Sequence, residues 1–236
     1  MRFTVSSTAL SSKLNALAKV INSKNSLPIL ADFLFDIQDN VLYLTASDSE
    51  NVINTQMELT ESDANGRFAI NNHDLLEAIK GFSEQPITFD VNLQDNIAKI
   101  SYQNGLFSLP VENADEYPQS QPITEGINTI VMPSNVLADN INRSLFATAQ
   151  DELRPVMNGI YFDLTPEHLA VVASDGHKLV RNKVFTVQSE QPASFILPKK
   201  PAGLLKNLLQ KDGGDVEIKF NERNAEINYG DGRLSC

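Results

Sequence analysis

The chain repeats itself after 127 residues. Ala46-Ser47-Asp48 returns as Ala173-Ser174-Asp175, and Phe35-Asp36 returns as Phe162-Asp163. A period of this length predicts whole domains rather than the short units of a solenoid. We therefore expect two equivalent domains, residues 1–125 and residues 126–236. The same offset, without a gap, pairs Pro28 with Pro155, Leu42 with Leu169, Phe68 with Phe195, Ile100 with Ile227, Tyr102 with Tyr229 and Gly105 with Gly232.

The composition is that of a soluble globular protein, with 42% apolar and 21% charged residues. No apolar run reaches the roughly 18–20 residues of a membrane span, and the N-terminus lacks the apolar region of a signal peptide. The single cysteine, Cys236, excludes an intrachain disulfide framework and favours a reducing compartment. We expect a cytoplasmic protein with no membrane partner, and a second repeat that stops at Cys236 within its last strand.

The charge is distributed unevenly along the chain. The net charge is −11, yet residues 6–31 carry Lys13, Lys19 and Lys24 without an acidic residue, and residues 198–211 carry four more lysines without one. Chance and solvated helix faces account for such windows as well as a function does. The alternative is a molecule that is acidic outside and has a local basic lining. Its net charge excludes binding of nucleic acid by bulk attraction, but the basic lining allows local contacts with nucleic acid.

Hydrophobic periodicity predicts the same order of elements four times, a strand, a helix and three strands. Residues 3–5 begin the pattern as a strand, and apolar residues at helical spacing follow as far as Ile21. The fold class is α+β, a tandem of domains in which two helices pack on antiparallel sheets. Residues 110–128 are polar, carry three prolines and lack periodicity, which predicts an inter-domain linker. The pattern restarts at residues 67–70, 130–132 and 195–197.

The residue patterns of common active sites are absent. There is no glycine-rich phosphate loop, and three scattered histidines with one cysteine lack zinc spacing, so we expect no cofactor, no metal and no catalytic residue. Asp175-Gly176-His177 could orient a nucleophile, as in Ser–His–Asp sites. The adjacent serine, Ser174, is badly placed for this role, because neighbouring residues on a strand point to opposite faces. The simpler interpretation is a tight turn that Asp175 closes and Gly176 permits.

The two copies diverge directly after the shared Ala-Ser-Asp. The first continues with Ser49-Glu50-Asn51-Val52 and the second with Gly176-His177-Lys178-Leu179. A purely structural turn would not need this divergence, so the second edge is predicted to have a task of its own. Met157 and Leu179 nearby favour a peptide groove.

These residues resemble one family, the bacterial sliding clamp, which is the beta subunit of DNA polymerase III. Members have three such domains, so the resemblance implies that the chain holds the N-terminal and central clamp domains and lacks the third. The likeness covers the whole chain and rests on Phe3-Thr4-Val5, Ser26-Leu27-Pro28-Ile29-Leu30, Asn158-Gly159, Ala173-Ser174-Asp175-Gly176-His177-Lys178-Leu179 and Pro198-Lys199-Lys200.

The resemblance implies a ring-forming processivity factor of DNA replication. Two full-length chains would form a head-to-tail homodimer around double-stranded DNA, with helices lining the hole. The clamp itself would be non-catalytic, because the DNA-directed DNA polymerase activity belongs to the holoenzyme. Contacts with phosphates would be independent of sequence. The lysines that would make them are Lys24, Lys80, Lys199, Lys200 and Lys206.

The resemblance also implies a groove for short linear motifs of the DNA polymerase III alpha subunit, the clamp loader and repair polymerases. The third domain would supply its other half. Two interpretations from other classes stay open, a hydrolase built on Asp175 and His177, and a tandem-repeat scaffold or adhesion protein without a role on DNA. The matching groove positions are Arg154, Met157, Ser174, Gly176, His177, Lys178 and Leu179.

Overall fold

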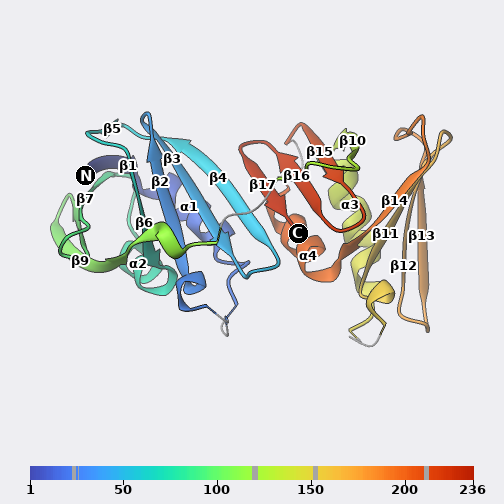
Figure 1. Cartoon of the computed structure of the whole chain (residues 1–236), viewed down its shortest axis with the longest axis horizontal. Coiled ribbons are helices and arrows are strands. Elements are labelled where there is room, and N and C mark those ends of the chain that lie inside the picture. Colours follow the sequence, from blue (N-terminus) through green and yellow to red (C-terminus); the bar gives the residue numbers. More distant parts are fainter. Residues whose placement is uncertain (23–24, 26, 119–121, 151–153, 210–212) are drawn as a thin grey trace. The chain divides into compact units, whose positions relative to one another are not determined.

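The chain divides into two compact units, Met1–Ser120 (unit 1) and Gln121–Cys236 (unit 2), which are described one at a time. Figure 1 shows helices and antiparallel strands in each of them. No helix of the described residues combines the length and the apolar character needed to cross a membrane. The computed structural model describes residues 1–22, 25, 27–118, 122–150, 154–209 and 213–236.

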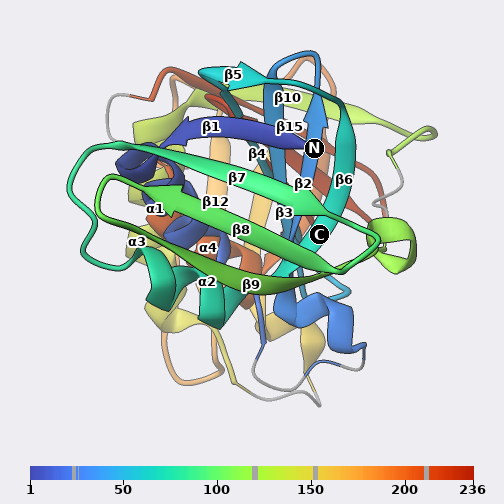
Figure 2. The ribbon, with the colours of Figure 1, turned by 90° about the vertical axis from the view of Figure 1, so that its left-hand side faces the viewer.

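Unit 1 runs through strand, helix and three strands twice, as the periodicity predicts, with one short additional strand, β5. Its strands follow the order β4-β3-β2-β6-β9-β8-β7-β1-β5, and Figure 2 shows β1, β7, β8 and β9 side by side. The two helices contact each other and pack on the strands. The elements are β1 (Arg2–Ser6), α1 (Ser7–Leu17), β2 (Asp32–Gln38), β3 (Val41–Ser47), β4 (Val52–Glu58), β5 (Glu61–Ser62), β6 (Gly66–Asn71), α2 (Asn72–Ile79), β7 (Pro86–Asn92), β8 (Ile97–Tyr102) and β9 (Gly105–Glu112).

Unit 2 repeats this order, and its described residues include no strand equivalent to β5. Its strands form the runs β10-β15-β16-β17 and β13-β12-β11-β14, and its two helices again contact each other. The α+β tandem predicted from the sequence is therefore confirmed. The elements are β10 (Asn128–Pro133), α3 (Ser134–Ser144), β11 (Gly159–Leu164), β12 (Leu169–Ser174), β13 (Leu179–Val184), β14 (Ala193–Pro198), α4 (Lys199–Leu208), β15 (Asp215–Phe220), β16 (Ala225–Tyr229) and β17 (Gly232–Ser235).

The sequence period is also a structural period. Helices α1 and α3 begin 127 residues apart, and so do α2 and α4. Phe35 pairs with Phe68 between β2 and β6, and Phe162 pairs with Phe195 between β11 and β14. The two ring pairs stack with centroids 5.0 Å and 4.9 Å apart. Equivalent residues thus form equivalent parts of the two apolar cores.

One strand departs from the ungapped repeat, which corrects the expectation of a uniform offset. Phe3 pairs with Phe89, whereas its counterpart Ile130 pairs with Ile218 rather than with Val216. Helix α4 is two residues longer than α2, so β15 begins its pairing two residues late. The next hairpin recovers the register because it is two residues shorter than its counterpart: Ile218 pairs with Ile227, nine residues later, whereas Phe89 pairs with Ile100, eleven residues later. An insertion and a deletion that cancel leave no trace in an ungapped alignment.

The segment expected as a linker, residues 110–128, contains regular secondary structure. Strand β9 extends to Glu112, and Ala114–Glu116 form a short 3₁₀ helix. Tyr117 is buried, and its hydroxyl donates to the Asp32 carbonyl. Val111, Ala114 and Tyr117 are buried, although the composition of the segment is polar. A smaller correction concerns the first helix, which ends at Leu17 and does not reach Ile21.

The helix starts differ between the two units. Ser6 caps α1 by accepting a hydrogen bond from the Ala9 N–H, and Asn71 caps α2 by accepting from the N–H groups of the first turn. Prolines precede α3 and α4, Pro133 and Pro198, and they have no side chain that can accept such a bond. The start of α4 is therefore less stabilised locally than the start of α2.

Candidate partner and DNA-binding site

A tight turn joins β12 to β13 in unit 2. The Asp175 carboxylate accepts hydrogen bonds from the backbone N–H groups of His177 and Lys178, each at 3.0 Å. The Ser174 hydroxyl donates to the Lys178 carbonyl at 2.9 Å and accepts from the Gly176 N–H at 3.2 Å. Gly176 has a φ of 87°, a conformation that other residues rarely adopt. Asp175, Ser174 and Gly176 therefore hold the turn that presents His177 and Lys178.

The same hydrogen bonds leave Asp175 unsuited to catalysis. Its backbone donors, first Lys178 and then His177, together with the Lys178 ammonium, hold the pKa of this carboxyl far below its usual range. The Lys178 Nζ lies 3.1 Å from the second carboxylate oxygen. A carboxylate occupied in this way orients a turn rather than the His177 ring, which favours the turn interpretation over the hydrolase.

A hollow of about 740 Å³ lies beside this turn. Its cationic residues come from three places, the segment before β11, the turn and α4. Phe146, 63% exposed, is an aromatic wall of the hollow, and the Lys178 Nζ lies 5.8 Å from its ring centroid, within cation–π range. The lining residues are Asn142, Leu145, Phe146, Thr148, Ala149, Gln150, Arg154, Asp175, His177, Lys178, Lys199 and Lys206.

The residues predicted for the partner groove fall into two groups. Arg154, His177 and Lys178 line the hollow, whereas Met157, Ser174, Gly176 and Leu179 do not. Leu179 is 68% exposed at the start of the edge strand β13, and Met157 is half-buried. A Cβ atom on Gly176 would lie 3.4 Å from Nη1 of Arg154, so the guanidinium packs closely over the turn.

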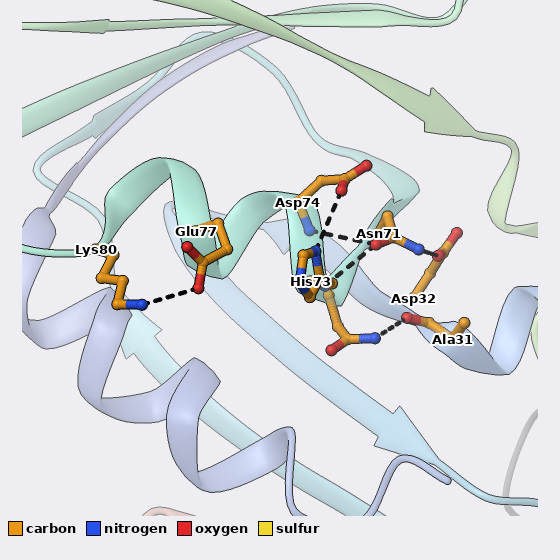
Figure 3. A network of polar contacts seen from close by, with 8 residues as sticks. Ala31, Asp32, Asn71, His73, Asp74, Glu77 and Lys80 are labelled. Atoms are coloured by element: carbon orange, nitrogen blue, oxygen red, sulfur yellow. Dashed lines mark hydrogen bonds and ion pairs between the residues drawn. The ribbon is translucent and has the colours of Figure 1, made fainter. Parts of the chain in front are cut away.

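The five lysines predicted to contact DNA are spread over both units. Lys24 lies outside the described residues. Lys80 ends α2 and forms an ion pair with Glu77 at 3.1 Å, as Figure 3 shows. Lys199 and Lys200 open α4, and Lys206 lies in its last turn. The structure thus brings Lys199 and Lys206, predicted for DNA, into the same hollow as residues predicted for the peptide groove.

The position of Lys199 and Lys200 is locally unfavourable. The N-terminus of a helix carries partial positive charge, so cations in the first turn destabilise it, typically by a few tenths of a kcal/mol to about 1 kcal/mol. The counterpart helix α2 instead has Asp74 in its first turn and Asn71 as its cap. Because α4 tolerates two lysines where its counterpart has favourable residues, their presence points to a function beyond the helix itself.

One face of the unit 2 sheet is exposed, whereas the equivalent face of unit 1 is covered by other residues. In unit 1, Leu34 pairs with Ala69, and both are buried. In unit 2 the equivalent pair, Tyr161 and Ile196, is 37% and 38% exposed. The unit 1 face is covered by a cluster of apolar residues that includes two from the segment after β9. The cluster consists of Ile29, Leu30, Leu34, Ala69, Ala114 and Tyr117.

Two more residues of the unit 2 face are open. Val156, the counterpart of Ile29, is 69% exposed, and Leu179 is the counterpart of half-buried Val52. We name Val156, Met157, Tyr161, Leu179 and Ile196 the open face. Exposed apolar residues gathered on one face are typical of an interaction surface. Only Met157 and Leu179 were predicted from the sequence.

Three residues of the site escaped sequence reasoning. Phe146 follows the apolar stripe of α3 and looks like its continuation, yet it lies in a 3₁₀ turn that directs it outward. Tyr161 and Ile196 lie in strands whose alternation does not reveal which face is covered. A comparison with the equivalent residues of unit 1 could have identified the pair. Tyr161 takes the position of Leu34 and Ile196 that of Ala69, so each has a larger side chain than its counterpart.

A buried carboxyl distinguishes the inner end of the unit 1 face. Asp32 accepts a hydrogen bond from Asn71 at 3.2 Å, within the network of Figure 3. Burial, followed by the charge of Glu112, raises the pKa of Asp32 to about 6. Its counterpart is Gly159, whose added Cβ would lie 2.5 Å from Ile196 and 2.8 Å from the Leu197 carbonyl oxygen. Unit 2 therefore has a glycine in place of the buried carboxyl, and the missing side chain leaves room for Ile196.

Curated relatives match the sequence along nearly the whole chain. Curated beta sliding clamps of Haemophilus influenzae and Halalkalibacterium halodurans are each 26% identical to this chain, over 97% and 94% of it. The chain spans about 62% and 60% of the length of these two relatives. It therefore corresponds to somewhat less than two thirds of the proteins it matches.

Solved structures give the same result for the fold. The sliding clamp of Pseudomonas aeruginosa bound to griselimycin superposes with a TM-score of 0.92 at 24% identity, covering 100% of this chain and 63% of that one. The Helicobacter pylori clamp bound to a DNA ligase peptide superposes with a TM-score of 0.87 at 22% identity, over 100% and 65% of the two chains. These likenesses show the fold of the two units.

Family models match nearly the whole chain. The N-terminal domain of the DNA polymerase III beta subunit matches residues 1–121, and the central domain matches residues 131–236. The first match covers unit 1 and one further residue, and the second lies within unit 2, so the N-terminal domain precedes the central domain as their names require. The chain therefore belongs to the DNA polymerase III beta subunit family, the beta sliding clamps.

Proposed function

We propose that this chain supplies the first two domains of a sliding clamp that encircles duplex DNA and tethers a replicative polymerase to it. The domains are residues 1–125 and 126–236, and a third domain completes each half of a homodimeric ring. The clamp is a non-catalytic, cytoplasmic subunit, and polymerase activity belongs to the assembly. Membership of the family supports this proposal, together with the open face.

The observation that carries the proposal is the contrast between two equivalent faces. The two units share one fold, and in unit 1 this face of the sheet is covered. In unit 2 the same face is open, although the residues on it are apolar. Exposing Tyr161, Leu179 and Ile196 to water costs hydrophobic free energy, about 25 cal/mol for each Å². A surface kept open at that cost is consistent with a site for a partner that covers it part of the time.

The partner proposed for this face is a short linear motif. The site consists of the predicted groove residues, with Met157 and Leu179 as apolar anchors and Arg154, His177 and Lys178 at its edge. The Helicobacter pylori clamp was solved with a DNA ligase peptide bound to it, which supports a peptide as the ligand here. The DNA polymerase III alpha subunit, the clamp loader and repair polymerases are the proposed sources of such motifs.

The DNA contacts proposed for the clamp are weak and independent of sequence. Lys80, Lys199, Lys200 and Lys206 lie on or directly beside the helices α2 and α4, and Lys24 completes the set proposed from the sequence. Lysine ammonium groups neutralise phosphates as point charges, without reading bases. Retention by a closed ring needs no tight contact, so a few lysines in a protein with a net charge of −11 are sufficient.

The experiment that tests the proposal is a titration of the full-length chain with a fluorescent copy of the DNA ligase peptide. We expect saturable binding to the wild type and none to Leu179→Asp, because a carboxylate on the open face removes an apolar anchor. Phe185→Asp is the matched control, because Phe185 is also an apolar residue of unit 2 and is 66% exposed, against 68% for Leu179. This variant should bind the peptide normally. Circular dichroism checks that both variants fold. Unchanged binding by Leu179→Asp would contradict the proposal.

A further inference from the structure

Strand β10 lies at an edge of the unit 2 sheet, whereas its counterpart β1 has a neighbour on both sides. Among the described strands, β10 pairs with β15 alone. Strand β1 pairs with β7 on one side and with the short strand β5 on the other, and Figure 2 shows it between the two. An edge strand presents backbone N–H and C=O groups that a further strand can pair with.

In unit 1, the segment that contains β5 takes up the outward-facing backbone groups of β1. The Thr4 carbonyl accepts from the Thr60 N–H at 2.9 Å, and the Arg2 carbonyl accepts from the Asp63 N–H at 3.0 Å. The Arg2 N–H donates to the Asp63 carboxylate at 2.7 Å. The backbone groups that face away from β7 therefore belong to Arg2 and Thr4.

In unit 2, the equivalent backbone groups belong to Thr129 and Val131. Ile130 and Met132, which alternate with them, are buried. The direction of the side chain and that of the hydrogen-bonding groups both alternate with a period of two along a strand. The two-residue register shift of β15 therefore leaves the outward groups the same. Thr129 and Val131 face an edge at which the described residues place no other strand.

The segment equivalent to β5 is held elsewhere in unit 2. It begins at Gln188, whose side-chain amide donates to the carbonyls of Glu167 and Phe185, at 3.2 Å and 3.3 Å. The Ser189 N–H donates to the Thr165 carbonyl at 3.1 Å. These bonds attach the segment to the hairpin between β11 and β12 rather than to β10. The edge is therefore left open by contacts that the structure itself makes.

The edge of β10 also lacks the charged side chains with which proteins commonly protect exposed strands. Residues 126–138 carry no charge. Strand β13, another edge strand of unit 2, carries the exposed cations Arg181 and Lys183. Pro133, which has no N–H to donate, is the last residue of β10 and leaves the middle of the strand open.

From these observations we propose that the free edge of β10 binds an extended segment of a partner protein, which adds to the sheet as an antiparallel strand. The segment is apolar opposite Val131. In unit 1 the equivalent Thr4 hydroxyl donates to the Glu61 carboxylate at 3.1 Å, a bond that Val131 cannot make. Val131 is 54% exposed, and Ile127 on the same face is 46% exposed, so apolar residues at alternate positions of the partner can cover both.

The site shares no residue with the proposed motif groove, so it is a second partner surface. A protein strand fits it better than nucleic acid does, because residues 126–138 offer no cation to a phosphate. A second copy of the chain fits less well, because two net charges of −11 repel each other. A second β10 would also bring another Pro133 without an N–H.

The test uses the full-length chain and a fluorescent synthetic peptide of alternating valine and threonine, with a lysine at each end for solubility. We expect saturable binding, with the valines on the same face as Val131 and their amides directed at β10. Methylation of the valine amide nitrogens should weaken binding at least about tenfold, because it removes these donors. Methylation of the threonine amide nitrogens, which face away from β10, is the matched control and should leave the affinity unchanged.

A substitution at the edge tests the same contact from the side of the protein. Thr129→Pro removes an outward N–H and leaves the pairing with β15 intact, as proline is tolerated where an edge N–H faces solvent. It should weaken binding of the unmethylated peptide about tenfold. Thr129→Ala keeps the N–H and should bind like the wild type. Circular dichroism checks that both variants fold, and the methylated peptides need no variant at all.

Each contrary outcome overturns the proposal in a recognisable way. Absence of binding by the wild type, or equal affinities for the two methylated peptides, would exclude strand addition. Unchanged binding by folded Thr129→Pro would exclude this edge. Displacement by unlabelled DNA ligase peptide would place the synthetic peptide in the motif groove instead. Sedimentation that shows self-association of the wild type, abolished in Thr129→Pro, would assign the edge to a second copy of the chain.

Discussion

The turns at Asp48 and Asp175 have the same backbone and different surfaces. Asp48 accepts hydrogen bonds from the N–H groups of Glu50 and Asn51, as Asp175 does from the equivalent residues. Ser49, at the position of Gly176, has a φ of 83°. The shared Ser-Asp is therefore explained by turn geometry alone, and it carries no information about function.

The difference lies in the side chains that the turns present. Asn51 is buried and donates back to the Asp48 carboxylate, whereas its counterpart Lys178 is exposed and reaches Phe146. Val52 is half-buried and Leu179 exposed. In unit 1 the turn serves the fold, and in unit 2 the same turn supports an open, cationic surface. The comparison teaches that divergence between repeats, rather than their common motif, marks the candidate site.

The largest expected effect tests whether the two sheet faces differ in coverage. Tyr117→Ala removes a buried ring from the unit 1 cluster and should lower the free energy of unfolding by about 3 kcal/mol. Tyr161→Ala, on the open face, should change it by less than about 0.5 kcal/mol. Urea unfolding of both variants measures the contrast. Similar losses for the two would show that the unit 2 face is covered as well.

A smaller effect concerns Asp32, which has no carboxyl counterpart in unit 2. The folded chain holds the Asp32 proton with a pKa of about 6, above the ordinary value of 3.8. Protonation therefore favours the folded state, and this contribution to stability appears as the pH falls from about 7 to about 4 and is lost again as it rises.

The variant Asp32→Asn isolates this contribution from the other carboxyl groups. It keeps an acceptor for Asn71 but carries no charge, so it should exceed the wild type in stability by about 2 kcal/mol at pH 8 and lose that advantage at pH 4. Urea unfolding at pH 4, 5, 6, 7 and 8 measures the difference between the two chains. A difference that does not change with pH would contradict the raised pKa.

The smallest effect compares the two turns directly. Asp48→Ala leaves two backbone N–H groups and the buried Asn51 amide without their acceptor, which should cost about 1–2 kcal/mol of unfolding free energy. Asp175→Ala should destabilise less, because its turn is exposed to water. It should also weaken binding of the DNA ligase peptide, since Lys178, at the edge of the proposed groove, loses the partner that positions it. Equal stability losses, with unchanged peptide binding, would mean that the two turns differ in sequence only.

Much of the fold could be predicted from the sequence. The 127-residue repeat, the order of strands and helices and the α+β class followed from apolar periodicity, which is a local property of the chain. The two-residue shift of β15 did not, because a longer α4 and a shorter hairpin between β15 and β16 cancel in an ungapped alignment. The order around Tyr117 also escaped, since a polar composition does not reveal that one aromatic ring is buried by distant residues.

The sequence by itself determined the repeat, the family resemblance, and the divergence that singles out His177, Lys178 and Leu179. Only the tertiary structure decided that Lys199 and Lys206 share a hollow with Arg154, His177 and Lys178. Residues so far apart along the chain meet because α4 starts directly at the end of β14, in the same sheet as the turn. Coverage is likewise a property of packing: Leu34 and Tyr161 occupy equivalent strand positions, and only a segment from elsewhere makes one buried and leaves the other exposed.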